Sequence, residues 1–335
     1  MADKPILAIA LGDAAGVGPE IVAKAMLDEG IRSVCRPLIV GKEWVLAQAF
    51  ALVGGALPLR RLTAASQAAY RADELDVLEV GDLRPEDVHV GQLGVVTGRE
   101  SGEALVLAAQ MVASGQAHGL VSAPVNKGAL ALAGFGHGHL EVVAQAIGAP
   151  GPFSSLLAGP RLKVINMTDH CAVAEALRRI TRERIITSLR LAQQSFRQWG
   201  YERPRIAVCA VNPHNGDNGT FGREEIDVIA PAVAAARDEG IDACGPLPVD
   251  TLFARAIAGE FDVVLAMYHD QGFTPVKTVG LHDTASLGLG LPIPYATTDH
   301  GTGFDLAGRG VANPGSLKQA FRAVVELCIG THAFA

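Results

Sequence analysis

Three histidines follow short apolar runs of the sequence, each a few residues after the run ends. His170 follows "KVINMT", His214 follows "RIAVCAVNP" and His269 follows "VVLAMY". A single histidine after a strand more often forms a cap or a hydrogen bond. Three in equivalent places could hold a Zn, Ni, Co or Mn ion that binds a substrate oxygen. The intervals of 43 and 54 residues between them are too long for a sequence-local metal motif.

A second candidate is the segment "TTDHGTGFDLAGRGVANPGSLKQAF", residues 297–321, which is rich in glycine and poor in charge. It could be a plain surface loop, but long glycine-rich loops inside compact domains are usually functional. Exposed backbone amides could wrap a ribose or an adenine. The segment "LGDAAGVGPEIVAKA", residues 11–25, opens a helix and could hold a phosphate or only turn tightly. Neither segment matches a Walker A loop or a GxGxxG fingerprint, so no motif supports a Rossmann fold.

Other single residues are weaker candidates. His139 in "GHGHLE" lies near a helix start, and Asn126 and Lys127 end the strand of "SAPVNK". Asp250 in "GPLPVDT" precedes an expected helix, where an N-cap is its default role. Cys171 lies beside His170, but no orienting partner for a cysteine nucleophile can be named, so this hypothesis is rejected.

These candidates must be positioned by alternating strands and helices, which are typical of an α/β fold. The ligand crevice of an open α/β sheet lies beyond the carboxyl ends of the strands, where the three histidines are expected. The pattern predicts strands at 6–11, 37–40, 76–79, 119–122, 162–167, 205–211, 262–267 and near 291–295, and helices at 19–28, 97–114, 181–199, 223–237, 252–258 and 315–329.

Composition limits the other possibilities. At 335 residues, with 49% hydrophobic and 19% charged residues, the chain predicts two packed lobes with a large buried core. A net charge of −7 without charged blocks gives nucleic acid or an acidic membrane surface nothing to bind. The five cysteines show no CxxC spacing, and no apolar run reaches the roughly 18 residues of a membrane helix. These features predict a cytoplasmic protein without disulfides.

Six motifs together resemble the 4-hydroxythreonine-4-phosphate dehydrogenase family. They are "GDAAGVGPE", "APVNK", "NPHNGDNGTFGREE", "GPLPVDTLF", "AMYHDQGFTPVK" and "DHGTGFDLAGRGVA", which run in order from Gly12 to Ala312. The resemblance implies the fold of the isocitrate and isopropylmalate dehydrogenases, with two α/β/α lobes and a cleft between them. On this basis we expect a nucleotide-binding lobe of residues 1–125 plus 285–335, and a metal- and dimer-forming lobe of residues 126–284.

The resemblance also implies a reaction. Family members oxidise a secondary alcohol of a hydroxy acid with NAD or NADP and a divalent metal (Zn, Co, Mn, Ni or Mg), and the product loses carbon dioxide. They are homodimers with the site at the subunit interface. The family's metal ligands fall on His170, His214 and His269; Lys277 would hold the anionic substrate, with Asp250 supporting the catalytic site. The nucleotide contacts would be Gly301, Thr302, Asp305, Gly308 and Asn313.

Substrate contacts of the family fall on His139 and Lys277, which match, and on Leu140, Ser286 and Tyr295, which depart from the family pattern. The family has Thr, Asn and Arg at these three positions. Loss of the Arg removes the usual partner of a phosphate dianion. We therefore predict an unphosphorylated substrate, with a cis-dihydrodiol carboxylate of the terephthalate type as the alternative. A zinc hydrolase and a non-catalytic binding protein are weaker hypotheses. We also expect a turn at Gly272 that directs Lys277 to the substrate.

Overall fold

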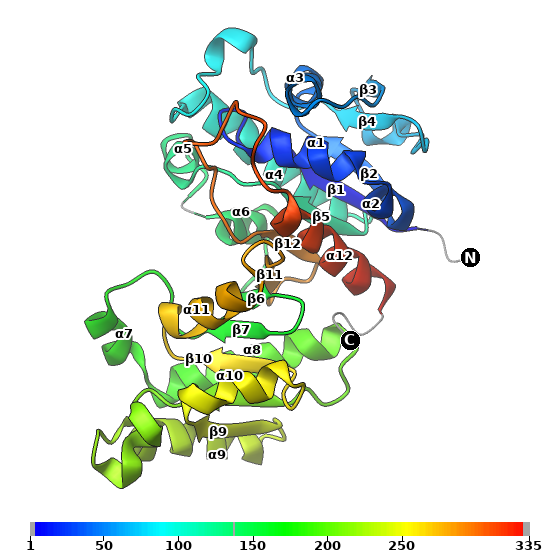
Figure 1. Cartoon of the computed structure of the whole chain (residues 1–335). Coiled ribbons are helices and arrows are strands. Elements are labelled where there is room, and N and C mark those ends of the chain that lie inside the picture. The colour runs from blue at the N-terminus through cyan, green and yellow to red at the C-terminus, as the bar shows by residue number, and fades with distance from the viewer. Residues whose placement is uncertain (1–3, 137, 331–335) are drawn as a thin grey trace. The chain divides into compact units, whose positions relative to one another are not determined.

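The chain divides into two compact units, each built from strands and helices. The computed structural model in Figure 1 describes residues 4–136 and 138–330. Unit 1 contains the described residues up to 151 together with 291–329, and unit 2 contains 152–290 with Gly330. The predicted α/β class is confirmed. The predicted cleft between lobes and the likeness to isocitrate dehydrogenase stay predictions.

The division between the units lies at 151/152 and 290/291, whereas the sequence suggested 125/126 and 284/285. Residues 126–151 belong to unit 1 because the helices α5 (Lys127–Leu132) and α6 (His139–Ala146) pack against α4 (Val95–Ala113). The buried side chains of α6 are Val142, Val143 and Ala144. His139 and Leu140 are therefore part of unit 1.

Unit 1 contains parallel strands in the order β3-β4-β2-β1-β5-β12. Their bounds are β1 (Ile6–Ala10), β2 (Arg36–Val40), β3 (Leu59–Leu62), β4 (Leu75–Leu78), β5 (Gly119–Ser122) and β12 (Tyr295–Thr298). The central strands are buried on both faces, as expected for a parallel sheet covered by helices. Chain order reverses between β1 and β5, so a ligand crevice is expected beyond the ends of these two strands.

Two helical layers cover the unit 1 sheet. One layer contains α1 (Gly18–Leu27), α2 (Glu29–Val34), α3 (Glu43–Val53) and α12 (Gly315–Ile329), and α4 with α5 and α6 forms the other. Short 3₁₀ turns lie at η1 (Ala65–Gln67) and η2 (Pro85–Asp87). Helix α1 follows β1 directly, with Pro19 in its first turn, so its start lies at the carboxyl edge of the sheet.

Unit 2 contains strands in the order β11-β6-β7-β10-β8-β9. Their bounds are β6 (Ser154–Ala158), β7 (Lys163–Asn166), β8 (Ile206–Cys209), β9 (Ala243–Leu247), β10 (Val263–Ala266) and β11 (Ala285–Leu289). β6 runs antiparallel to β7 and β11, and the other pairs among the described strands are parallel. The covering helices are α7 (Val173–Arg179), α8 (Arg182–Gln198), η4 (Glu225–Ile229), α9 (Ala230–Asp238), α10 (Val249–Ile257) and α11 (His269–Gly280), and the turn η3 (Pro213–Gly219) precedes η4.

The principal difference from the expected elements is α11. The sequence suggested a turn at Gly272, but residues 269–280 form a helix in which Gly272 is buried. A Cβ atom at Gly272 would collide with the side chains of Asn166 and Val164, so glycine lets α11 pack closely on β7. Pro275 inside the helix and this glycine hid α11 in the sequence, since both residues oppose helix formation.

Candidate metal and nucleotide sites

Three neighbouring parallel strands of unit 2 end at one edge of the sheet. β10 lies between β7 and β8, with Ala266 beside Asn166 and Leu265 beside Val208. Beyond the strands, the Met167 N–H donates to the Ala266 carbonyl (2.8 Å) and the Thr168 hydroxyl to the Met267 carbonyl (2.9 Å). These two hydrogen bonds join the segment that follows β7 to the segment that follows β10, just before His170 and His269.

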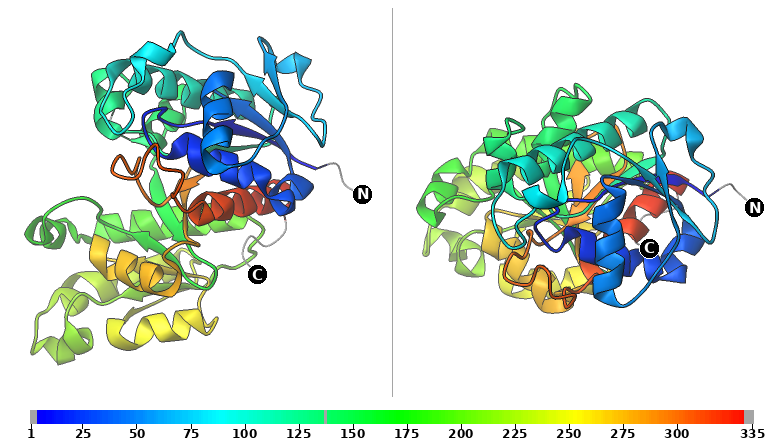
Figure 2. Two further views of the ribbon diagram at one scale, coloured as in Figure 1. Left: turned by 45° about the horizontal axis from the view of Figure 1, so that its top comes forward. Right: turned by 90° about the horizontal axis from the view of Figure 1, so that it is seen from above.

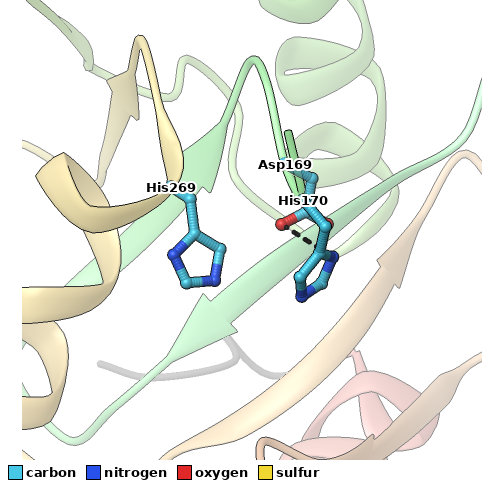
Figure 3. A group of neighbouring side chains, drawn as sticks. All are labelled: Asp169, His170 and His269. Carbon is cyan, nitrogen blue, oxygen red and sulfur yellow. Dashed lines mark ion pairs between the residues drawn. The ribbon is translucent and has the colours of Figure 1, made fainter. Parts of the chain in front are cut away.

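The structure brings two of the three predicted metal ligands together. Asp169, His170 and His269 each offer a ligand atom within 4.8 Å of the others. The two imidazole rings point into the same space (Figure 3), with centroids 5.2 Å apart. A pocket of about 170 Å³ adjoins them, lined also by Cys171, Val173, Ala176, Tyr268 and Asp270. Asp169 is an addition to the predicted ligand set, although it was visible in the sequence beside His170.

The surroundings of His269 suit a metal ligand. Its Nδ1 lies 2.6 Å from Asp270 Oδ1, so a proton on Nδ1 leaves Nε2 available for a cation. The ring stacks on Phe273 with centroids 4.0 Å apart and planes inclined by 11°. A carboxylate partner and an aromatic support fix the ring plane, which is how metal-binding histidines are commonly oriented. Two imidazoles and one carboxylate fit a borderline divalent ion such as Zn²⁺.

One face of α11 carries both a predicted metal ligand and the predicted anion-binding residue. His269, Phe273 and Lys277 are spaced four residues apart and therefore share that face. The Lys277 ammonium lies 5.9 Å from the centre of the Phe273 ring. Long helical side chains lean towards the helix N-terminus, so Lys277 leans towards the end that bears His269. Sequence reasoning missed Phe273, although its i, i+4 spacing to both residues was available once a helix was assumed.

His214 does not belong to the cluster of Asp169, His170 and His269 among the described residues. It is exposed in η3, where residues 214–218 all have positive φ angles. Apart from Gly216, these are His, Asn, Asp and Asn; Asn and Asp are the side chains that tolerate this conformation best. The loop presents His214 to solvent.

A buried carboxylate holds the start of this loop. Glu225, in the first turn of η4, accepts hydrogen bonds from the backbone N–H groups of Val211 and Asn212, both 2.7 Å, and from the Asn212 side chain at 2.9 Å. Burial alone would raise the pKa of Glu225, but these hydrogen bonds outweigh it and lower that pKa. The carboxylate therefore stays ionised and fixes the backbone that leads to His214.

The glycine-rich segment of unit 1 runs beside α1 (orange-red and blue in Figures 1 and 2). Glu20 is 3% exposed and accepts hydrogen bonds from the backbone N–H groups of Gly308 (2.6 Å) and Gly310 (2.9 Å). The Val17 N–H donates to the Thr302 carbonyl at 2.9 Å. The first turn of α1 therefore shapes the loop, a contact between distant parts of the sequence that sequence reasoning missed.

The predicted nucleotide residues lie along this segment. Thr302 is buried, whereas Gly301, Asp305, Gly308 and Asn313 are exposed. The Asn313 side chain accepts a hydrogen bond from the Gly315 N–H at the start of α12, so at least part of its role is structural. The exposed positions leave backbone and side chains accessible to a ligand.

The remaining predicted residues have diverse surroundings. Tyr295 is buried, and burial raises the pKa of its phenol. No atom of the described residues lies in hydrogen-bonding geometry with Tyr295 Oη. Ser286 is partly buried on β11 opposite Leu157. Asp250 is exposed within the first turn of α10, after the N-cap Pro248, so it is not itself the cap.

His139 and Leu140 begin α6 and are partly buried. The His139 Nε2 lies 3.3 Å from the Ala123 carbonyl. Burial lowers the pKa of His139 to about 4, the Ala123 carbonyl opposes this, and the charge of Lys127 adds to it. His139 is thus neutral at pH 7 and can form hydrogen bonds without adding charge.

Comparison with known proteins places these features in a family context. Residues 33–324 match the family model described as pyridoxal phosphate biosynthetic protein PdxA. The chain is 41% identical to a 4-hydroxythreonine-4-phosphate dehydrogenase of Beijerinckia indica, covering 100% of this chain and 98% of that one. It is 40% identical to a D-threonate 4-phosphate dehydrogenase of Cupriavidus necator, covering 96% and 97%.

The chain is also similar to solved structures of proteins with related names. A 4-hydroxythreonine-4-phosphate dehydrogenase from Burkholderia phymatum matches with a TM-score of 0.83 and 40% identity, over 97% of this chain and 98% of that one. A terephthalate 1,2-cis-dihydrodiol dehydrogenase from Burkholderia xenovorans LB400 is less similar, with a TM-score of 0.64 and 29% identity over 97% and 98%. Among the helices of the described residues, none is both long and apolar enough to cross a membrane.

Proposed function

Because the chain belongs to the PdxA family, we propose that it is an NAD- or NADP-dependent dehydrogenase that uses a divalent metal to oxidise a phosphorylated hydroxy acid. That it is an oxidoreductase acting on a CH–OH group, as the sequence predicted, follows from the dehydrogenase relatives. The metal, the choice between NAD and NADP, and the loss of carbon dioxide are parts of the proposal.

The observation on which the proposal rests is the convergence of His170, His269 and Asp169 beside a pocket, with Lys277 on the helix face of His269. This arrangement supports a cation site near a side chain that can bind an anion. A hydroxy acid with an anionic group has a hydroxyl oxygen that could bind the cation and an anion that could bind Lys277. A metal hydrolase would use the cation site alone and leave the glycine-rich loop of unit 1 without a role.

The cation would be held by His170 and His269, with His214 supplied by a second copy of the chain. His214 lies outside the cluster in a single chain and is exposed. A homodimer would therefore complete the predicted ligand set and place the site at the subunit interface. Asp169 would serve as a further ligand or as a hydrogen-bond partner of His170, whose Nδ1 is 3.5 Å away.

When bound, the cation would act as a Lewis acid towards the substrate oxygen and the nucleotide would accept the hydride. The residues of the chain would orient the reactants. Lys277 would hold the anionic end of the substrate, Asp270 would keep the tautomer of His269, and Phe273 would keep its ring plane. Neutral His139 would donate or accept a hydrogen bond without attracting a second anion. The glycine-rich loop would hold the nucleotide through its exposed backbone.

A phosphorylated substrate replaces the unphosphorylated one suggested by Leu140, Ser286 and Tyr295. The two relatives described above act on 4-hydroxythreonine 4-phosphate or D-threonate 4-phosphate, as their names state. The similarity to the terephthalate dihydrodiol dehydrogenase is lower in both sequence and structure. We therefore place the cis-dihydrodiol carboxylate below the phosphorylated acids. Tyr295 is buried and offers no charge to a phosphate. Lys277 would therefore be the main cationic partner of the substrate phosphate.

The proposal is tested by assaying NADH and NADPH formation with the purified protein loaded in turn with Zn²⁺, Co²⁺, Mn²⁺, Ni²⁺ or Mg²⁺. The substrates are 4-hydroxythreonine 4-phosphate, D-threonate 4-phosphate, their unphosphorylated forms and a cis-dihydrodiol carboxylate. We expect turnover of a phosphorylated acid that stops after chelation and returns with metal. Turnover of the dihydrodiol alone would overturn the substrate assignment, and reduction undiminished by complete metal removal would overturn the metal assignment.

A further inference from the structure

We propose that Glu20 is a positioning residue that fixes the glycine-rich loop of unit 1 in the form that receives the nucleotide, an inference that rests on the function proposed above. Glu20 lies in the first turn of α1, and its two carboxylate oxygens bind different amides of the loop. Oε1 accepts from the Gly308 N–H and Oε2 from the Gly310 N–H. These partners are separated from Glu20 by 288 and 290 residues in the sequence.

One face of α1 contacts the loop along its length. Val17, Glu20 and Lys24 follow a spacing of three and four residues, which places them on the same side of a helix. The Val17 N–H donates to the Thr302 carbonyl (2.9 Å), and Lys24 Nζ donates to the Ala312 carbonyl (2.6 Å). Glu20 binds the middle of the loop, between these two end contacts. The loop is thus tied at its start, its middle and its end.

The glycines are required for this arrangement. Gly308 and Gly310 have φ angles of +76° and +66°, a region that disfavours side chains. A Cβ at Gly310 would lie 2.9 Å from the Leu52 carbonyl oxygen. The loop therefore has little intrinsic preference for its observed conformation. The hydrogen bonds to Glu20 stabilise that conformation. A carboxylate can accept both hydrogen bonds, whereas an amide has only one acceptor oxygen.

The requirement for a carboxylate gives the test. The Glu20→Gln variant keeps the size of the side chain but turns one acceptor into a donor that faces an N–H group. We expect faster hydrogen exchange of residues 300–313 in the nucleotide-free protein, together with a rise of about tenfold in the KM for NAD or NADP. The kcat and the metal content should change little, because the hydrogen bonds of Glu20 go to the glycine-rich loop.

The matched control is Glu29→Gln, which changes an exposed glutamate in the same unit. Lys24→Met is the second variant, since it removes the contact with the Ala312 carbonyl and leaves Glu20 in place. It should speed exchange at the end of the loop and raise the nucleotide KM to a smaller degree. Lys24 is partly exposed, so this variant tests the tether even if Glu20→Gln does not fold.

The outcomes separate this inference from the proposed function. Unchanged exchange of residues 300–313 in both variants would overturn the tether and leave the proposed dehydrogenase intact. Faster exchange with unchanged nucleotide KM would show that the tether exists but that the loop does not receive the nucleotide, which overturns the positioning role. A raised nucleotide KM in the Glu29→Gln control as well would also overturn it. Absence of any nucleotide-dependent activity in the wild-type protein would instead count against the proposed function.

Discussion

In each unit a buried glutamate accepts hydrogen bonds that hold a loop, but the two glutamates differ in their sequence distance from the loop. In unit 2, Glu225 binds the N–H groups of Val211 and Asn212, only 14 and 13 residues away. In unit 1, Glu20 binds Gly308 and Gly310, almost the whole chain away. Both carboxylates lie in the first turn of a helix, where the dipole favours negative charge.

The loops themselves also differ in what they present. The unit 2 loop reaches left-handed backbone angles mainly with Asn, Asp and His, and so keeps side chains such as His214 at its surface. The unit 1 loop uses glycine at Gly303, Gly308 and Gly310 and presents mainly backbone. The unit 2 loop, which presents side chains, is thus held by a glutamate close to it in the sequence. The unit 1 loop, which presents mainly backbone, is held by a helix far from it in the sequence.

The largest expected effect concerns the cluster that the unit 2 loop is proposed to complete. His269→Ala should weaken metal binding by about 100-fold or more and abolish turnover, because it removes one of two histidines of the cluster. Metal content after dialysis and NAD(P)H formation measure this. His282→Ala, at an exposed position of unit 2, is the control. Full metal content in His269→Ala would break the assignment of unit 2 as the metal unit.

The second prediction compares the two glutamates that hold the loops, Glu225 and Glu20. Glu225→Gln should lower metal affinity by about tenfold, because it loosens the backbone that leads to His214. Glu20→Gln should leave metal affinity unchanged and alter only nucleotide binding. Metal titration of both variants, with Glu183→Gln in unit 2 as the exposed control, separates the roles. Equal effects of the two variants on metal affinity would remove the distinction between the loops.

The third prediction concerns how each loop reaches its left-handed angles. Gly310→Ala should destabilise the protein by about 1 to 2 kcal/mol, because φ is +66° there and a Cβ approaches the Leu52 carbonyl. Asn218→Gly, at φ +55°, should change stability by less than about 0.5 kcal/mol. Urea unfolding followed by a probe in each unit measures both. A larger loss for Asn218→Gly would contradict the proposed difference.

The fourth prediction is a difference in pH dependence between the units. Burial raises the pKa of Glu100 in unit 1 to about 8, with Lys42 opposing and Asp13 adding to the shift. The folded state then binds a proton that the unfolded state lacks, so stability falls as the pH rises from 4.5 to about 8. Glu225 contributes to stability with the opposite dependence on pH. Because its pKa is lower in the folded protein, it stabilises the fold at pH values above the ordinary pKa of a glutamate, and this stabilisation is lost as the pH falls.

Glu100→Gln should therefore flatten the stability of unit 1 between pH 4.5 and 8, while Glu225→Gln should flatten that of unit 2 at lower pH. Hydrogen exchange resolved by unit is the suitable measurement, because two units need not unfold together. Parallel pH profiles for Glu100→Gln and the wild-type protein would refute the raised pKa.

The sequence predicted the local features of both regions better than the distant ones. The apolar runs that became β7, β8 and β10 were recognised, and their shared edge predicted that His170 and His269 would meet. Helix α11 was missed because Pro275 and Gly272 oppose a helix in isolation, whereas packing on β7 favours it. The strands β3, β6, β9 and β11 were missed as well.

The contacts of Glu20 could not be predicted, because nothing in the sequence near α1 indicates a partner almost 300 residues away. The same holds for the burial of Tyr295, which the sequence suggested as a pocket residue. His214 shows the limit of reasoning from strand ends. It follows a strand of the shared edge, but four residues of loop separate it from β8, and the direction of that loop depends on Glu225.

Under the proposed function, helix α11 would also impose a length requirement on the substrate. His269 and Lys277 are eight residues apart on one helix, a rise of about 12 Å between their backbones that the lean of the lysine shortens. A helix is stiff, so α11 would fix the distance between the oxygen to be oxidised and the anionic end of the substrate. Adding or removing one carbon between those two groups should therefore weaken turnover more than changing the substituents along the chain.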